Sequence, residues 1–271
     1  MRKNIYQLIS EKICDPFTET ERIVFLFEKE KIYYGESLMQ FIDNNYFRNM
    51  KMRGTSLSIS DLKEQLGLLS EVSLDGLLTY CEFIENIIYQ YIEQGENDDE
   101  RINQQIITII DNLKCILDCT NHEITKLDDN TLIITEKNKA AAQAASLIDD
   151  SEKALKAIEY NHVGLKGDLH GKQSILKQLG DLVEPLLKSH VLKNSGYGQL
   201  EDDAGFLLNN CQIRHENKSG KNRKDFISQI DDDVLEEFYD KTYQALLMVI
   251  IANDQIEVSK EIKELKTQYK W

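Results

Sequence analysis

The sequence predicts a mainly α protein, made of helical bundles with one small β-hairpin. Apolar residues recur at every third and fourth position along most of the 271 residues, which is the spacing of one helix face. The composition agrees, because the chain has only 2 prolines and 13 glycines and is 41% hydrophobic. Apolar and polar residues alternate clearly in one short stretch, and β-structure is expected only there.

An N-terminal helical domain is expected over residues 1–120. Its first part reads as short helices, one of them opening with a capping box of Thr18 and Glu21. A longer helix is predicted from Ser73 to Gly95, and a second apolar repeat runs from Ile102 to Leu117. Since the polar stretch between them is short, we expect an antiparallel helical hairpin that forms the core of this domain.

Residues 121–160 are expected to form a β-hairpin followed by a helical spacer. Segments 123–127 and 131–135 have strand character, and the three polar residues between them suit a tight turn. An alanine-rich run after Lys139 returns to helix. A domain boundary near residue 160 follows.

The remaining residues, 161–271, are expected to form a second helical bundle. The helices are predicted at Lys172 to Leu192 with a kink or break near Pro185, Leu200 to about Asn217, Val234 to about Asn253, and Glu257 to Tyr269. Short connections make neighbouring helices antiparallel, which gives a bundle.

The overall charge limits the kind of partner. A formal net charge of -15 repels phosphate, which argues against a protein that coats DNA and requires any nucleic-acid contact to be local. The N-terminal stretch has neither the pattern of a signal peptide nor that of a membrane span, so the expected location is the cytoplasm. Five cysteines without an export signal predict reduced thiols.

Two other sequence patterns are only weak evidence for a metal site or a phosphate site. Cys115, Cys119 and His122 have a zinc-like spacing, but no fourth ligand stands nearby, so the two cysteines are assigned to helix packing. The segment from Gly167 to Ser174 resembles a phosphate loop only superficially, and a turn leading into a helix is expected instead. No metal and no cofactor are predicted.

One segment of this acidic chain is basic. Residues 213–224 hold five Lys and Arg against one Glu. Helical spacing would place Asn210 and Arg214 on one stripe with His215 beside them. A guanidinium can stabilise charge on a phosphorane and an imidazole can move a proton, so this trio suits metal-independent cleavage of RNA. The alternative is that Arg214 and His215 simply end a helix, where cations are favoured.

The same segment resembles a known family. The pattern Asn209-Asn210-x-x-Ile213-Arg214-His215-x-Asn217, with the helix that follows it, is similar to the C-terminal HEPN domain of abortive-infection proteins over roughly residues 160 to 255. That resemblance implies a dimeric helical bundle, RNA as substrate and a role in phage defence. The chain departs from the family motif, because His215 directly follows Arg214 and Ser219-Gly220-Lys221 stands where the motif histidine belongs.

The leading hypothesis is therefore an abortive-infection endoribonuclease that acts as a homodimer. Arg214, His215 and Asn210 are its predicted catalytic residues, and its predicted RNA-binding residues are Asn217, Lys218, Lys221 and Arg223. The dimer is expected through an apolar helix face that contains Phe238, Tyr239, Tyr243, Leu246, Leu247 and Ile250.

A noncatalytic HEPN-like module that binds a nucleotide or a protein partner is the alternative hypothesis. The N-terminal domain matches no known motif, and three roles stay open for it. They are sensing a phage component, docking a partner protein and enlarging the dimer.

Overall fold

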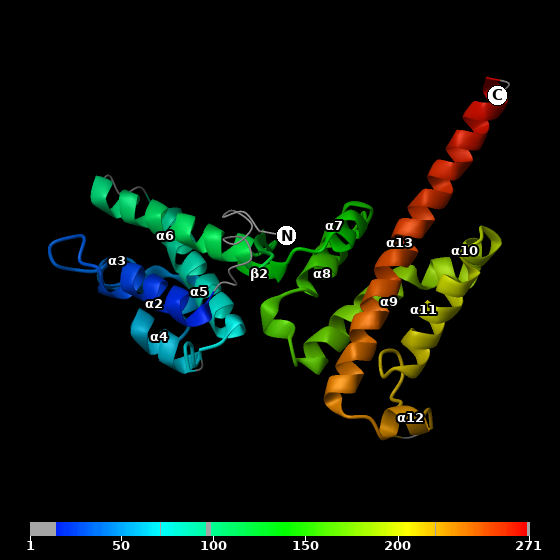
Figure 1. Cartoon of the computed structure of the whole chain (residues 1–271), viewed down its shortest axis with the longest axis horizontal. Helices are drawn as coiled ribbons and strands as arrows, with labels where there is room; N and C mark the ends of the chain where they lie inside the picture. The colour runs from blue at the N-terminus through cyan, green and yellow to red at the C-terminus, as the bar shows by residue number, and fades with distance from the viewer. Residues whose placement is uncertain (1–14, 71, 96–98, 220, 270–271) are drawn as a thin grey trace, which may run out of the picture. The chain divides into compact units, whose positions relative to one another are not determined.

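The computed structural model describes residues 15–70, 72–95, 99–219 and 221–269 (Figure 1). The protein is mainly α with one two-stranded antiparallel sheet, which confirms the predicted fold class. Its contacts divide the chain into two compact units between Lys137 and Asn138. Within the described ranges, each helix is too short or too polar to cross a lipid bilayer.

The first unit begins with short helices. They are α2 (Pro16–Val24), α3 (Leu38–Asn45) and α4 (Ile59–Gln65), with single π or 3₁₀ turns at Phe25–Lys29, Phe47–Asn49 and Lys51–Arg53. The predicted capping box at Thr18 is wrong by three residues, because the Asp15 carboxylate caps α2 by accepting from the Thr18 backbone N at 3.0 Å. Pro16 explains the earlier start, since its fixed φ suits the first helical position. The part of the predicted domain before Asp15 lies outside the described residues.

Two long helices supply most of the core of this unit. They are α5 (Leu74–Glu93) and α6 (Glu100–Cys119), close to the predicted bounds. The apolar face of α5 is buried at Leu77, Leu78, Cys81, Ile84 and Ile88, and that of α6 at Ile102, Ile109 and Leu113. The two helices contact each other and also contact α2, so the predicted helical core is present.

The β-hairpin packs on α5 through its second strand and on α6 through its first. Strands β1 (His122–Lys126) and β2 (Leu132–Glu136) pair antiparallel, with Ile124 opposite Ile134. The Asn86 side chain on α5 holds β2 by donating to the Leu132 carbonyl at 2.7 Å and accepting from the Leu132 backbone N at 3.0 Å. The hairpin therefore belongs to the first unit.

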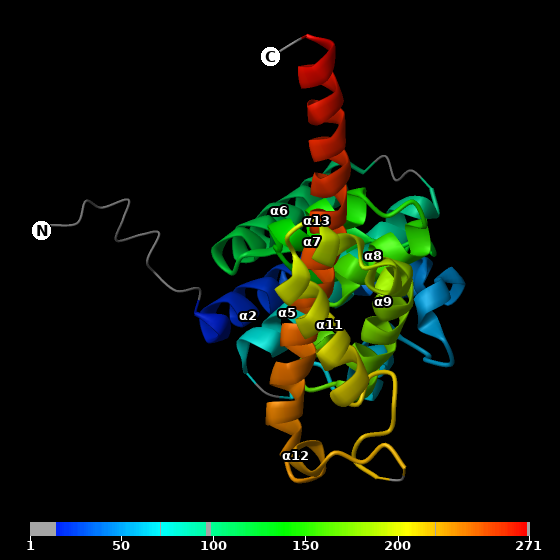
Figure 2. The same cartoon turned by 90° about the vertical axis from the view of Figure 1, so that its right-hand side faces the viewer.

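The second unit is a helical bundle (Figure 2). Its helices are α7 (Lys139–Ser146), α8 (Ser151–Glu159), α9 (Leu169–Ser189), α10 (Val191–Asn194), α11 (Gly198–Asn210), α12 (Asp225–Ser228) and α13 (Asp232–Gln268), with a 3₁₀ turn at Val163–Leu165. α13 contacts α7, α9, α10 and α11, so it is the central helix of the bundle. Its buried residues include Tyr239, Tyr243, Leu246, Leu247 and Ile250.

The predicted hairpin-and-spacer segment at 121–160 is divided between the two units. β2 packs on α5 and β1 packs on α6, whereas α7 packs on α13 and α8 packs on α9. Ala141, Ala144 and Ala157 are buried in the core of the second unit. These small side chains allow close packing of the helices. From the sequence, the alanine-rich run indicated only a high helix propensity.

Three predicted helix ends differ from the structure. α9 continues through Pro185 and ends at Ser189, because His190 takes a left-handed φ of 54°. The helix predicted to reach Asn217 ends at Asn210, and the two predicted C-terminal helices form one continuous helix, α13. No proline or glycine interrupts residues 254–256, so nothing local forces a break there.

Candidate functional site

The segment 211–224, which we call the basic loop, leaves the helix before the predicted stripe can form. Cys211 departs from helical backbone angles, and Gln212 has a left-handed φ of 63°. Gln173 on α9 donates to the Gln212 carbonyl and so fixes this turn against the bundle. Asn210 and Arg214 therefore do not share a helix face, which corrects the spacing argument.

Asn217 organises the basic loop from inside. Its side chain is fully buried. The Oδ1 atom accepts from the Gln212 backbone N at 2.8 Å, and Nδ2 donates to the carbonyls of Asn222 at 3.0 Å and Asn209 at 3.3 Å. A buried amide with these partners holds three chain segments together. The prediction that Asn217 binds RNA is wrong for this arrangement, because no phosphate can reach its side chain.

Two further side chains complete the loop. The Gln212 Oε1 atom accepts from the backbone N of Asn217 at 2.6 Å and of Lys218 at 2.9 Å. The Glu216 carboxylate accepts from Gln212 Nε2 at 2.9 Å and from the backbone N of Lys218 and Ser219. These hydrogen bonds, led by the one from Gln212, lower the pKa of Glu216. The loop is thus internally hydrogen-bonded despite its lack of regular secondary structure.

Arg214 is directed toward α9. Its side chain is 17% exposed, and Nη2 donates to the Gly180 carbonyl at 3.0 Å. The same nitrogen lies 3.9 Å from Glu184 Oε2, and the buried Nε has no hydrogen-bond partner among the described residues. The pKa of Glu184 is lowered, first by a hydrogen bond from Lys188 and then by the charge of Arg214. The guanidinium therefore positions the loop against the bundle.

The other two predicted catalytic residues are Asn210, the last residue of α11, and His215, on the basic loop. Asn210 Nδ2 donates to the Phe206 carbonyl at 2.8 Å, which satisfies a group in the last turn of α11. His215 is exposed. With Arg214 turned inward and His215 outward, the structure does not bring the predicted catalytic trio together.

The predicted phosphate-binding cations are on the surface. Lys221 and Arg223 are exposed, and Lys218 is partly exposed. Lys218 Nζ lies 3.0 Å from Asp232 Oδ1, and Arg223 lies 3.7 Å from Asp225. Surface pairs of this kind are weak and can exchange for another anion. Acidic residues are as frequent as basic ones over 213–233, so the positive region is small.

Three phenylalanines form an aromatic group on the same part of the bundle. Phe206 on α11 and Phe226 on α12 are 52% and 43% exposed, and their nearly parallel rings have centroids 6.4 Å apart. Phe238 on α13 meets Phe226 edge to face, also at 6.4 Å. Lys241 Nζ lies 5.2 Å from the centroid of the Phe238 ring. Phe226 was not predicted as a functional residue, although an aromatic residue directly after Arg223-Lys224-Asp225 is a signal of nucleic-acid binding in the sequence.

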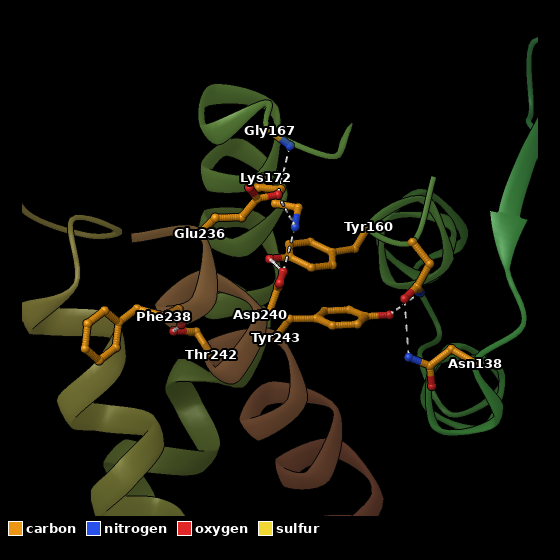
Figure 3. Close-up of polar contacts among 10 residues, drawn as sticks. Asn138, Tyr160, Gly167, Lys172, Glu236, Phe238, Asp240, Thr242 and Tyr243 are labelled. Atoms are coloured by element: carbon orange, nitrogen blue, oxygen red, sulfur yellow. Dashed lines mark hydrogen bonds and ion pairs between the residues drawn. The ribbon is translucent and has the colours of Figure 1, made fainter. Parts of the chain in front are cut away.

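A polar cluster, buried at Lys172 and exposed at Asp240, lies on another side of α13 from Phe238 (Figure 3). Lys172 Nζ is 2.8 Å from Glu236 Oε1 and 2.7 Å from Asp240 Oδ1, and it lies over the ring of Tyr160. Tyr160 also donates to Asp240 at 2.9 Å and stacks on Tyr243. Burial, followed by the charge of Asp240, raises the pKa of Tyr160. These groups satisfy one another, so the cluster joins α9 to α13 and offers no ligand site.

This cluster also explains the segment that resembled a phosphate loop. The Gly167 backbone N donates to Glu236 Oε1 at 2.9 Å, and the Asp168 side chain caps α9 by accepting from Gly171 N. The expected turn leading into a helix is confirmed.

The four cysteines among the described residues are free thiols. Cys81 and Cys211 are buried, whereas Cys115 and Cys119 are exposed, so the assignment of the latter two to core packing is wrong. They lie on the polar side of an amphipathic helix whose buried face is made by isoleucine and leucine. Among the described residues, no group of three His, Cys, Asp or Glu side chains is placed to hold a metal.

The first unit contains a pocket of about 820 Å³ beside α5 and the hairpin turn. Phe83 and Met52 contribute apolar surface to it, and Glu82, Asn86 and Gln90 contribute polar side chains. These three polar side chains accept from the backbone N of Ile134, Leu132 and Met52, respectively. These three side chains therefore hold parts of the first unit together, and their arrangement does not indicate which class of ligand the pocket would bind.

Comparisons with family models, characterised proteins and solved structures find no match for this chain.

Proposed function

We propose that the second unit is a HEPN-like module that binds single-stranded RNA in the cytoplasm without cutting it. The observation that carries this proposal is the orientation of Arg214, whose guanidinium is held by the Gly180 carbonyl. A group that stabilises a phosphorane must reach the scissile phosphate, and Arg214 does not face solvent in this way. What remains available is a surface of exposed cations and phenylalanines.

The chemistry of that surface fits single-stranded RNA. Lys221, Arg223 and Lys224 are exposed and supply charge for phosphates. Phe206 and Phe226 supply ring faces for bases, which stack on aromatic side chains in single strands but not in a closed duplex. Because acidic residues flank the basic loop, we expect modest affinity that falls with added salt.

The biological setting is proposed from the sequence resemblance alone. The pattern from Asn209 to Asn217 is similar to that of abortive-infection proteins, which implies phage defence. A binding role agrees with the departure of this chain from the family motif at Ser219-Gly220-Lys221.

A metal-independent endoribonuclease is the second candidate, and the exposure of His215 on the basic loop favours it. In that case Arg214 would have to leave Gly180 when RNA binds. The two candidates predict different fates for the bound RNA.

Binding is tested by fluorescence anisotropy of a labelled oligouridylate with the full chain. We expect Phe226→Ala to weaken binding by about tenfold through lost stacking, and Arg223→Ala by about threefold. Lys263→Ala removes an exposed lysine from α13 far along the sequence from the loop and serves as the matched control. Because Phe226 also contacts Phe238, Phe226→Leu keeps most of the apolar packing and isolates the loss of the ring. Equal affinities for all four variants and the wild type would exclude this surface.

Cleavage is tested by incubating the protein with total RNA in EDTA. The binding proposal predicts intact RNA at all times. Fragments that accumulate with the wild type and disappear in both Arg214→Ala and His215→Ala would establish the endoribonuclease instead.

A further inference from the structure

The C-terminal part of α13 extends beyond the rest of the second unit (Figure 1). Ile256 is the last buried residue of this helix, and every residue from Lys260 to Tyr269 is exposed. A helical segment of this length without tertiary packing is marginal in water. Burial of one of its faces would stabilise it.

An apolar stripe follows this extension. It consists of Val258, Ile262, Leu265 and Tyr269, which are 37%, 43%, 54% and 74% exposed. Their spacing of four, three and four residues is that of consecutive d and a positions in a coiled-coil heptad. At about 100° per residue, the stripe lies on the face opposite Ile256. Leu265 is in line with the buried Leu247 about five turns earlier, so the stripe continues one edge of the packed face of α13 beyond the bundle.

Charged side chains border the stripe in a self-complementary way. In this heptad frame Glu261 occupies a g position and Lys266 the following e position. In two parallel copies, a g residue meets the e residue five positions later on the other helix, so Glu261 meets Lys266 twice about the two-fold axis. The outer positions hold the polar residues Lys260, Lys263, Glu264 and Thr267.

We propose that Val258, Ile262, Leu265 and Tyr269 pair with the same residues of a second copy as a short parallel coiled coil. This interface differs from the dimer face predicted from sequence. Tyr239, Tyr243, Leu246, Leu247 and Ile250 of that face are buried within the second unit itself and are not available to a partner. The proposal also extends beyond RNA binding and does not depend on it.

The test is sedimentation velocity of the full chain over concentrations from about 1 to about 200 µM. Because only about two heptads take part, we expect a reversible dimer with a Kd on the order of tens of micromolar. Ile262→Asp should raise the Kd at least about tenfold by placing two charges in the seam. Thr267→Asp, on the outer face of the next turn, is the matched control and should leave the Kd unchanged.

Charge reversal tests the orientation. Glu261→Lys and Lys266→Glu should each weaken the dimer about threefold to tenfold, and their combination should restore the wild-type Kd. An unchanged thermal unfolding curve of each variant shows that the bundle remains folded. A wild-type monomer at every concentration, or a dimer that Ile262→Asp leaves intact, overturns the proposal. Failure of the combined variant to recover overturns the parallel register.

Discussion

Lys172 and Glu85 are two buried ionisable side chains with opposite surroundings. Lys172, in the second unit, is 7% exposed and contacts the carboxylates of Glu236 and Asp240. Glu85, on α5 of the first unit, is also 7% exposed, yet its Oε1 has no hydrogen-bond partner among the described residues. Burial raises the pKa of Glu85 to about 7, and Lys114 offsets this only in part. A buried carboxylate without partners tends to take up a proton, because burial penalises its charged form.

This difference distinguishes charged side chains that hold the fold together from those that are exposed and can bind a ligand. Arg214 is an intermediate case, because Nη2 is hydrogen-bonded and Nε is buried without a partner. The cations of the basic loop that remain exposed are the ones free to exchange partners. We therefore expect substitutions of buried and of exposed charged residues to change the free energy of unfolding by different amounts.

The largest expected effect is that of Lys172→Met. It removes the buried ammonium that lies between the carboxylates of Glu236 and Asp240, and we expect a loss of about 3 kcal/mol in the free energy of unfolding of the second unit. Urea unfolding followed by near-UV circular dichroism of the stacked Tyr160 and Tyr243 measures it. Lys188→Met, which removes a 74% exposed partner of Glu184 on the same helix, is the control and should change little.

Glu85→Gln should stabilise the first unit at high pH. The pKa of Glu85 is about 7 in the folded protein against an ordinary value of 4.5, so folded protein binds this proton more tightly than unfolded protein. Its contribution is full below about pH 4.5 and is lost as the pH rises through 7. We expect the variant to gain about 2 kcal/mol over the wild type between pH 5 and pH 8. Parallel pH dependences of the two proteins in urea unfolding would mean that Glu85 is solvated.

Arg214→Met should have a smaller effect. It removes the hydrogen bond to the Gly180 carbonyl but also removes the buried Nε, so we expect a net loss of about 1 kcal/mol in urea unfolding. Oligouridylate affinity should stay the same, because the guanidinium does not face the solvent. A marked fall in affinity without loss of stability would place Arg214 among the RNA-binding groups.

Lys221→Ala should have the smallest effect on folding. Its side chain is exposed, so the unfolding free energy should change by less than about 0.5 kcal/mol. RNA affinity should fall about twofold to threefold, with a shallower dependence on salt. An unchanged salt slope would show that Lys221 makes no phosphate contact.

The long periodic segments were predictable from sequence, and the basic loop was not. α5 and α6 carry regular apolar stripes, and the hairpin combines strand character with a polar turn, so local rules sufficed. The turn at Gln212 depends instead on a hydrogen bond from its backbone to the buried Asn217 side chain five residues later. The sequence pattern predicted a helix that continues to Asn217. Helical periodicity does not indicate that the Asn217 side-chain amide is buried, so this contact could not be predicted.

The candidate site was predictable as a region but not in its arrangement. The excess of Lys and Arg at 213–224 identified the exposed cations. Whether Arg214 faces α9 or the solvent is decided by the end of α11, which propensity does not fix. The aromatic group needed three helices to bring Phe206, Phe226 and Phe238 together, and such long-range proximity is not encoded in spacing.

The continuity of α13 has a consequence for its exchange with solvent. The amides around Leu246 and the amides after Lys260 belong to one helix, but only the former are packed in the bundle. Deuterium uptake should therefore be slow at Leu246 and fast near Leu265 in dilute protein. If two copies associate through the extension, uptake near Leu265 should slow as protein concentration rises, while uptake at Leu246 stays constant. A single helix would then report folding at one end and assembly at the other.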